Sequence, residues 1–192
     1  IPEHIEETIF HLGQGYAFFE QDVNKEFLYN GNSISNNADF TNYLNRLGYK
    51  FKNEEYEYGG YIKLQNKKIC LTMDAGSTPN IKYTKNYQSG ALSFEIISNG
   101  NKLLSNCGYH KIRNSNLNQL SKSSATHNTL VIDDTSSCKF IYRDKSWMIK
   151  KGLKVNKKNI IFRKNYWKIH ASHDGYLKKY NSVHEREIEF LP

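Results

Sequence analysis

The feature that most constrains the fold is a series of short segments, from about residue 60 to residue 190, in which apolar and polar residues alternate. In the segment 68–74, for example, every second residue from Ile69 onward is Ile, Leu or Met. A period of two places successive side chains on opposite faces of a strand, so each segment predicts a half-buried β-strand. Turn residues separate the segments, and Asn99-Gly100 is the strongest hairpin signal among them. The pattern predicts a mainly β protein, an antiparallel β-sandwich rather than a βαβ fold.

The expected strands cover most of the chain after residue 56. They are 60–64, 68–74, 92–96, 102–106, 127–133, 139–143, 147–150, 159–163, 166–172 and 183–190. In the last of them Glu185, Glu187 and Glu189 occupy alternate positions and therefore share one face. The stretch 108–124 is rich in Asn and Ser and is expected to be a long loop, which in a compact domain is usually functional or mobile.

The first 55 residues have a different character. Residues 2–12 and 35–48 are helix candidates, each followed or ended by a glycine, Gly13 and Gly48. We therefore expect residues 1–55 to form a helical and linker appendage that leads into a sandwich over residues 56–192. The abrupt start and end predict that the sandwich is truncated at both ends relative to a longer parent protein.

The charge of the chain favours a polyanionic partner. The net charge is +8, mostly from Lys, which suits a nucleic acid, an anionic membrane surface or an acidic polysaccharide; the alternative is an ordinary solvated lysine surface. The sequence has no run of five basic residues and no arginine-rich arm, which argues against specific nucleic-acid binding. No segment approaches the roughly 20 apolar residues of a membrane span. Cys70, Cys107 and Cys138 lack the spacing of a zinc site or a disulfide framework, so buried free thiols are expected.

Three blocks of the sequence carry a resemblance to a known family. They are the blocks Gln88-Ser89-Gly90-Ala91-Leu92-Ser93-Phe94-Glu95, Leu104-Ser105-Asn106-Cys107-Gly108 and Ala125-Thr126-His127-Asn128-Thr129-Leu130-Val131-Ile132-Asp133. In their order and spacing they resemble the β-domain of the heparinase II/III family of polysaccharide lyases. The resemblance extends to Asp74-Ala75-Gly76, to the stretch around His173 and to His184-Glu185-Arg186, so it spans the chain from Tyr58 onward.

The resemblance implies where a metal site and a catalytic residue would lie. In the family a metal, usually zinc, is held by two histidines and an aspartate, and a nearby histidine takes part in lysis. Here His127 stands at the position of one metal histidine, Gln88 at the other and Asn106 at the aspartate. Asn86 stands at the position of the catalytic histidine.

These replacements change the expected chemistry. Zinc prefers imidazole, thiolate and carboxylate ligands, and two neutral amides offer no negative charge to offset a dication. We therefore expect no cofactor, with zinc binding at best weak. Gln88, Asn106 and His127 are expected to converge instead as a hydrogen-bonded polar cluster that keeps the geometry of the metal site.

A second set of candidate residues lies in His173-Asp174-Gly175-Tyr176. His173, Asp174 and Tyr176 could face a sugar-binding cleft and contact substrate. The alternative is a structural turn, because Asp-Gly favours tight turns and the tyrosine would then cover a hydrophobic edge. Exposed tyrosines among Tyr56, Tyr58 and Tyr61 are further candidates for stacking on a sugar.

The function implied by the resemblance is cleavage of a uronic-acid-containing polysaccharide, such as alginate or a glycosaminoglycan, by β-elimination. In the family much of the catalytic machinery, including a tyrosine, belongs to an α/α-toroid domain that precedes the sandwich. We therefore expect that toroid as a partner within the same protein, and this chain alone to be catalytically incomplete. The alternative is a non-catalytic glycan-binding or structural sandwich that has lost the metal site. The resemblance points to a bacterial periplasm or envelope, while the unpaired cysteines and the lack of a visible signal peptide leave the cytoplasm open.

Overall fold

The computed structural model describes residues 56–191, except 111, 113–114 and 164–165, together with Arg46 and Gly48. Arg46 is helical and Gly48 lies in a turn with a φ of +78°. The predicted helix 2–12 and the rest of the predicted helix 35–48 lie outside the described residues. The described residues therefore belong to the predicted sandwich, apart from Arg46 and Gly48, which belong to the predicted appendage.

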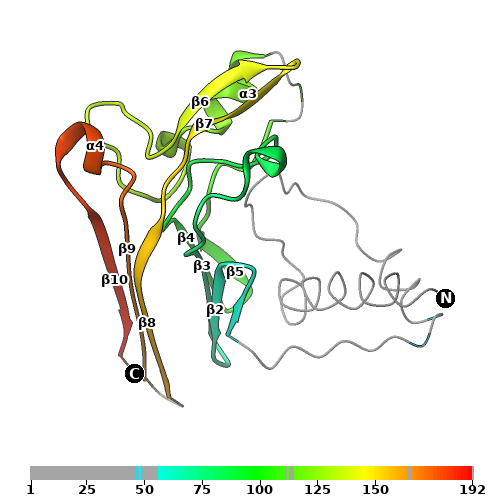
Figure 1. Cartoon of the computed structure of the whole chain (residues 1–192). Coiled ribbons are helices and arrows are strands. Elements are labelled where there is room, and N and C mark those ends of the chain that lie inside the picture. Colours follow the sequence, from blue (N-terminus) through cyan, green and yellow to red (C-terminus); the bar gives the residue numbers. More distant parts are fainter. Residues whose placement is uncertain are drawn as a thin grey trace.

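Most of the described strands form two antiparallel sheets, and a separate hairpin adds two more (Figure 1). One sheet has the order β1-β2-β3-β4-β5, with the strands Glu57–Tyr58, Tyr61–Gln65, Ile69–Asp74, Phe94–Ser98 and Asn101–Leu104. The other has the order β10-β9-β8, with the strands His184–Phe190, Tyr166–His173 and Val155–Arg163. The hairpin pairs β6, Lys139–Arg143, with β7, Ser146–Lys151.

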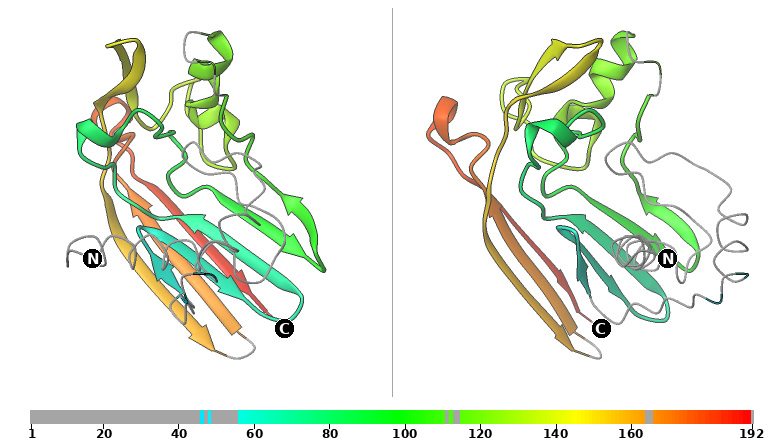
Figure 2. Two further views of the ribbon diagram at one scale, coloured as in Figure 1. Left: turned by 90° about the vertical axis from the view of Figure 1, so that its right-hand side faces the viewer. Right: turned by 45° about the vertical axis from the view of Figure 1, so that its right-hand side comes forward.

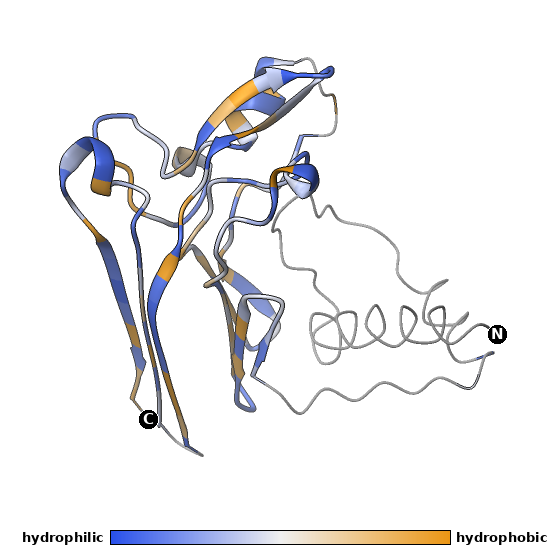
Figure 3. Cartoon of the chain, in the orientation of Figure 1, coloured by the Kyte–Doolittle hydropathy of each residue, from blue (hydrophilic) through white to orange (hydrophobic). Residues whose placement is uncertain are grey.

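The two sheets face one another across a common hydrophobic core, which confirms the predicted β-sandwich (Figure 2). Hydrophobic and hydrophilic residues alternate along the strands (Figure 3), so each sheet turns one apolar face inward. The core joins residues of β2 and β3 to residues of β9: Ile62, Leu64, Leu71, Met73, Trp167, Ile169 and Ala171. Trp167 also stacks on Phe190 of β10, with ring centroids 4.8 Å apart.

The hairpin turns follow the sequence signals. Asn99 and Gly100 adopt φ angles of +47° and +74°, the left-handed conformation that Asn-Gly tolerates best. At the turn between β2 and β3, the Asn66 side-chain oxygen accepts the amides of Lys68 and Ile69, each at 2.8 Å. These local bonds fix the register that places the apolar residues inward.

Two predictions about the segment between β5 and β6 were wrong. Residues 127–133 do not form a strand; the segment contains a single bridge, between Ile132 and Thr135, with Asp133 and Asp134 in the left-handed region. The predicted loop 108–124 contains helix α3, Asn116–Ser121, which is followed by a 3-10 turn η2, Ser124–Thr126. The Ser115 hydroxyl caps α3 by accepting the amide of Asn118 at 3.1 Å, a capping signal inside the Asn- and Ser-rich stretch.

Shorter elements complete the described part of the chain. They are the 3-10 turn η1, Ile81–Tyr83, and helix α4, Leu177–Tyr180. Among the described residues, no helix is long and apolar enough to cross a bilayer. Cys70 and Cys138 are buried free thiols as expected, whereas Cys107 is exposed, which corrects that part of the prediction.

A second, smaller hydrophobic cluster fastens the segment before β4 to the hairpin. It is formed by Tyr87, Ala91, Cys138, Ile149 and Leu153. Backbone contacts reinforce it: the Thr78 amide donates to the Leu153 carbonyl at 3.1 Å, and the Leu153 amide donates to the Thr78 hydroxyl at 2.9 Å. The stretch between β3 and β4 is thereby held against the junction of β7 and β8.

The packing predicts a large cost for shortening a side chain between the sheets. Leu64 is fully buried in β2, so Leu64→Ala should lower the free energy of unfolding by about 2–5 kcal/mol. Leu103 lies on the same sheet but is 64% exposed, so Leu103→Ala should change the free energy of unfolding by less than about 0.5 kcal/mol. Urea denaturation of the two variants measures the difference, and equal losses would contradict the assignment of the core.

Candidate functional site

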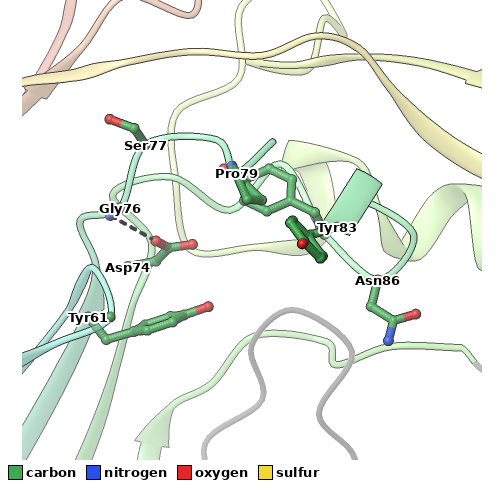
Figure 4. A pocket seen from close by; sticks show the side chains of 9 residues that line it. Tyr61, Asp74, Gly76, Ser77, Pro79, Tyr83 and Asn86 are labelled. Atoms are coloured by element: carbon green, nitrogen blue, oxygen red, sulfur yellow. Dashed lines mark hydrogen bonds between the residues drawn. The ribbon is translucent and has the colours of Figure 1, made fainter. Parts of the chain in front are cut away.

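A cavity of about 250 Å³ opens beside the ends of β2 and β3 (Figure 4). Its wall is polar and aromatic: Gly59, Tyr61, Asp74, Gly76, Ser77, Pro79, Tyr83, Asn86 and Tyr87. Tyr61 comes from β2, Asp74 ends β3, and Tyr83, Asn86 and Tyr87 come from η1 and the chain that follows it. We call this cavity the tyrosine pocket.

The backbone around the tyrosine pocket is shaped by a close approach of two glycines. A Cβ atom on Gly60 would lie 2.7 Å from the Gly76 Cα, and Gly60 has a φ of +88°. The Ala75 amide donates to the Gly60 carbonyl at 2.9 Å. Glycine is therefore required at position 60, where the turn brings Tyr61 and Asp74 to one side of the pocket.

The other wall is held by side chains that bond to the backbone. Asn80 caps η1 by accepting the Lys82 amide at 3.1 Å. Thr84 is fully buried, and its hydroxyl donates to the Ile81 carbonyl at 2.8 Å. Lys122 is also buried, and its ammonium donates to the carbonyls of Lys85 at 2.5 Å and Tyr87 at 3.1 Å, the residues on either side of Asn86. Burial lowers the pKa of Lys122 to about 8.

The side chains of the tyrosine pocket suit recognition of a hydroxyl-rich ring. Tyr83 is 76% exposed and offers an aromatic face, while the Asn86 amide can both donate and accept. The Asp74 carboxylate accepts the Gly76 amide at 3.1 Å. The Tyr87 hydroxyl is buried and has no hydrogen-bond partner among the described residues. Burial, assisted by the charge of Asp74, raises the pKa of Tyr87 well above its usual value, so this phenol stays protonated as a donor.

Asn86, which the resemblance places at the family's catalytic histidine position, lies in the wall of the tyrosine pocket and is exposed. An amide cannot accept a proton as a general base at neutral pH, although it can donate a hydrogen bond to a carboxylate. Its position is compatible with contact to a ligand in the pocket. A catalytic role for Asn86 stays a prediction.

Gln88 ties together two segments that the sequence separates. Its side chain is buried, and the amide nitrogen donates to the carbonyl of Gly108 at 2.9 Å and to that of Ser121 at 2.5 Å. The neighbouring Ser89 amide donates to the Lys122 carbonyl at 2.9 Å. Gln88 thus joins the chain before β4 to the segment after β5 and to the end of α3.

Asn106 and His127 are brought together through Asn128. The Asn106 side-chain oxygen accepts the Asn128 amide at 3.0 Å. His127 Nδ1 lies 2.8 Å from the Ser123 carbonyl, which can only accept, so Nδ1 carries the proton and Nε2 holds the lone pair. Burial lowers the pKa of His127, which keeps the ring neutral.

The three residues do not fit a zinc site. The Gln88 nitrogen and the Asn106 oxygen are engaged with the backbone, and among the described residues no group of three His, Cys, Asp or Glu could hold a metal. Of the three residues only His127 has an imidazole, and its Nε2 is the nitrogen that could bind a metal. One neutral ligand is too few to hold zinc. These side-chain hydrogen bonds of Gln88 and Asn106 run to the backbone, and the loss of the family's metal site stays a prediction.

Four buried polar atoms in this part of the chain have no hydrogen-bond partner among the described residues. They are His127 Nε2, the Asn106 side-chain nitrogen, Ser89 Oγ and Ser93 Oγ. A Cβ atom on Gly90 would lie 2.9 Å from His127 Cδ2 and 3.2 Å from Ser93 Oγ, so the ring and this serine pack around the same glycine.

His173, Asp174 and Tyr176 lie in a turn whose two rings are buried. The Gly175 amide donates to His173 Nδ1 at 3.1 Å, so the proton lies on Nε2, which donates to His184 Nδ1 at 3.0 Å. The Asp174 carboxylate accepts the Lys154 amide at 2.7 Å, and the Tyr176 hydroxyl donates to the Leu130 carbonyl at 2.5 Å. These contacts are those of a structural turn, and contact of the three residues with substrate stays an untested prediction.

Sequence reasoning did not identify two tyrosines of the pocket as candidates. Tyr83 and Tyr87 lie on either side of Asn86 in the sequence. Two aromatic residues so close to a position that the resemblance singles out could have indicated that they line the same site. Of the proposed stacking residues, Tyr61 lines the tyrosine pocket. Tyr56 lies instead beside Phe162, with ring centroids 6.0 Å apart.

The polar arrangement at His127 predicts a structural role without zinc. His127→Ala should lower the free energy of unfolding by about 1–3 kcal/mol, because it leaves buried polar partners unpaired. Low micromolar zinc should raise the melting temperature of the unmodified protein by less than about 1 °C, since a ligand well below its Kd stabilises little. A zinc-induced shift of many degrees that His127→Ala abolishes would contradict this.

The pair of His173 and His184 predicts a dependence of stability on pH. Burial lowers the pKa of each to about 4; for His173 the charge of His184 adds to this, and for His184 that of Arg186. Between about pH 6.5 and about pH 4 the two histidines of the unfolded chain therefore bind protons that those of the folded protein do not. The free energy of unfolding falls as the pH falls through this window.

The test compares melting temperatures from pH 7 to pH 4. His184→Gln removes one titrating ring and should flatten the decline relative to the unmodified protein. His110→Gln, a histidine outside the pair, serves as the matched control and should leave the decline unchanged. Equal behaviour of the two variants would exclude the pair as its source.

Comparisons with known proteins bear on the fold and the family. A family model described as Heparinase II/III-like, C-terminal, matches residues 51–192. A solved heparinase III with methylated lysines superposes with a TM-score of 0.72 and 13% identity, covering 100% of this chain and 31% of that one. A mutant of the heparan sulfate lyase HepC from Pedobacter heparinus superposes with a TM-score of 0.69 and 12% identity, and it too is matched over 100% of this chain and 31% of its own. No curated protein sequence matches the chain.

The two solved proteins share the fold of this chain, although sequence identity is low. The chain spans 31% of the length of each. The family model covers the whole sandwich. The chain therefore belongs to the family of heparinase II/III-like C-terminal domains.

Proposed function

We propose that this chain is the β-sandwich part of a polysaccharide lyase that cleaves a uronic-acid-containing glycan by β-elimination. The observation that carries the proposal is the tyrosine pocket, in which the family's catalytic position, Asn86, lies among tyrosines and a carboxylate. A structural neighbour described as a heparan sulfate lyase supports a glycosaminoglycan as the substrate class. Alginate and other polyuronates share the carboxylate that the chemistry requires.

The reaction sets three requirements. A base removes the proton on the carbon next to the uronate carboxylate, the bond from the neighbouring carbon to the glycosidic oxygen breaks, and that oxygen takes up a proton. The products are an unsaturated sugar and a free hydroxyl. The carboxylate must be neutralised or hydrogen-bonded so that negative charge can develop beside it.

The groups of the tyrosine pocket fit part of this task. In the proposal the Asn86 amide donates to the substrate carboxylate and the exposed Tyr83 stacks on a sugar face. The described lining of the pocket contains no histidine. We therefore assign proton abstraction to a domain outside this chain, an α/α-toroid in the same protein that faces the pocket.

The second candidate is a sandwich that binds glycan without cleaving it. The observation that favours it is the set of amides at Asn86, Gln88 and Asn106, because the family's histidines and aspartate are absent from these positions. The tyrosine pocket would serve such a protein equally well. Turnover separates the two candidates, whereas binding alone does not.

The test uses the protein at its full natural length with heparan sulfate, alginate and polygalacturonate, following the ultraviolet absorbance of the unsaturated product. We expect product from at least one polymer. Asn86→Ala should lower kcat about 10²-fold, the usual effect of removing one donor to a developing charge. Asn101→Ala, an exposed residue of β5, is the matched control and should retain activity.

Two results would overturn the proposal. Folded protein that binds a uronate polymer and forms no product from any of them would favour the second candidate. Full activity of Asn86→Ala would remove the tyrosine pocket from the reaction.

A further inference from the structure

The positive charge of the chain is concentrated in one continuous stretch. Residues 139–164 contain ten of the 27 Lys and Arg residues and one of the 19 Asp and Glu residues, Asp144. The remainder of the chain holds 17 basic and 18 acidic residues, so it is close to neutral. The net charge of +8 therefore arises from this stretch.

The basic residues of the stretch are on the surface. Nine of them are described and all nine are exposed: Lys139, Arg143, Lys145, Lys150, Lys151, Lys154, Lys157, Lys158 and Arg163. Within the described part of the chain, two of the nine form ion pairs, Arg143 with Asp144 and Lys158 with Glu57. The other seven make no salt bridge with a described residue, so their charge is available to a partner.

The fold arranges these residues along one edge. β7 passes directly into β8, and the two run as a continuous band along one side of the molecule (Figure 1). β8 has nine residues, about 30 Å at 3.3 Å per residue, and is an edge strand of its described sheet. We call β6, β7, β8 and their connections, residues 139–163, the basic ribbon.

The opposite edge of the same sheet carries compensated charge. On β10, Glu185 bonds to His170, Glu187 to Lys168 at 2.8 Å and Glu189 to Tyr166 at 2.8 Å. The glutamates therefore have partners on β9, whereas Lys157 and Arg163 of β8 are exposed and form no salt bridge with a described residue. This asymmetry makes the basic ribbon a separate feature rather than part of an evenly charged surface.

The basic ribbon is also joined to the tyrosine pocket. The Val155 amide donates to the Ser77 hydroxyl at 2.9 Å, and the Ile149 amide donates to the Thr84 hydroxyl at 3.3 Å. Ser77 lines the pocket. A long ligand held by the ribbon would therefore pass close to the pocket wall.

We propose that the basic ribbon is a second binding surface, which holds an acidic polysaccharide chain outside the tyrosine pocket. The ligand class rests on the proposed function, and the ribbon adds an electrostatic site that the pocket does not contain. Lysine predominates, with seven of the nine basic residues of the ribbon, and acts as a point charge toward carboxylate or sulfate groups. Arg, which nucleic-acid surfaces favour for its bidentate bonds, supplies two of the nine basic residues, so a polysaccharide is the better match.

The experiment measures equilibrium binding of heparan sulfate and alginate at several salt concentrations. The variant Lys151→Gln/Lys154→Gln/Lys157→Gln removes three exposed charges of the basic ribbon. Lys67→Gln/Lys68→Gln/Lys178→Gln removes three exposed charges elsewhere and leaves the same net charge. We expect about tenfold weaker binding and a shallower salt dependence for the ribbon variant, from the loss of three exposed ion pairs. The control should bind within about twofold of the unmodified protein.

Equal losses in the two triple variants would overturn the proposal, because they would reflect net charge alone. Tighter binding of a single-stranded DNA oligonucleotide than of either polysaccharide at the same salt would overturn the choice of partner. Asn86→Ala separates this inference from the proposed function. It should lose product formation and keep the salt-dependent part of binding that the ribbon variant loses. Unmodified protein that binds the polymers in this salt-dependent way and forms no product from any of them would count against the proposed function alone.

Discussion

The structure depends on satisfying the polar backbone groups of the loops buried beside the sheets. A buried carbonyl or amide without a partner is costly, and these loops lack the regular pairing of a strand. Side chains supply the missing bonds. Gln88 donates to two carbonyls, Lys122 donates to two more, and Arg186 of β10 donates to the carbonyls of Leu92 at 2.7 Å and Asn128 at 2.5 Å. Arg186 also lies over the Phe94 ring, 5.1 Å from its centroid, so one cation joins the second sheet to the start of β4.

This polar framework positions the tyrosine pocket. Lys122 holds the carbonyls on both sides of Asn86, and Thr78 and Thr84 fasten the preceding chain to β7 and the connection after it. The amide of Gln88 and the ammonium of Lys122 hold the loops around Asn86 by bonds to backbone carbonyls. In our proposals, the pocket contributes aromatic contact and the basic ribbon contributes long-range charge.

The sequence predicted the sheets well and the loops poorly, for a physical reason. A strand is specified by local alternation and turn residues, and the strands β2, β3, β6, β9 and β10 lie within one residue of their predicted bounds. The segment 127–133 alternates too, but its bonds go elsewhere: the Asn128 amide and the Thr129 hydroxyl bond to Asn106 and Ala91. The resemblance located Asn86, whereas the pocket around it depends on Tyr61 and Tyr87 meeting from distant segments, which no local pattern encodes.

Amide hydrogen exchange, with and without a metal chelator, tests the central claim most directly. The amides of Ser89, Cys107 and Asn128 donate to Lys122, Thr126 and Asn106 in the buried loops. If hydrogen bonds hold these loops, the three amides should exchange about as slowly as those of β3, and a chelator should leave their rates unchanged. Rapid exchange at all three amides, or protection that the chelator removes, would contradict the account.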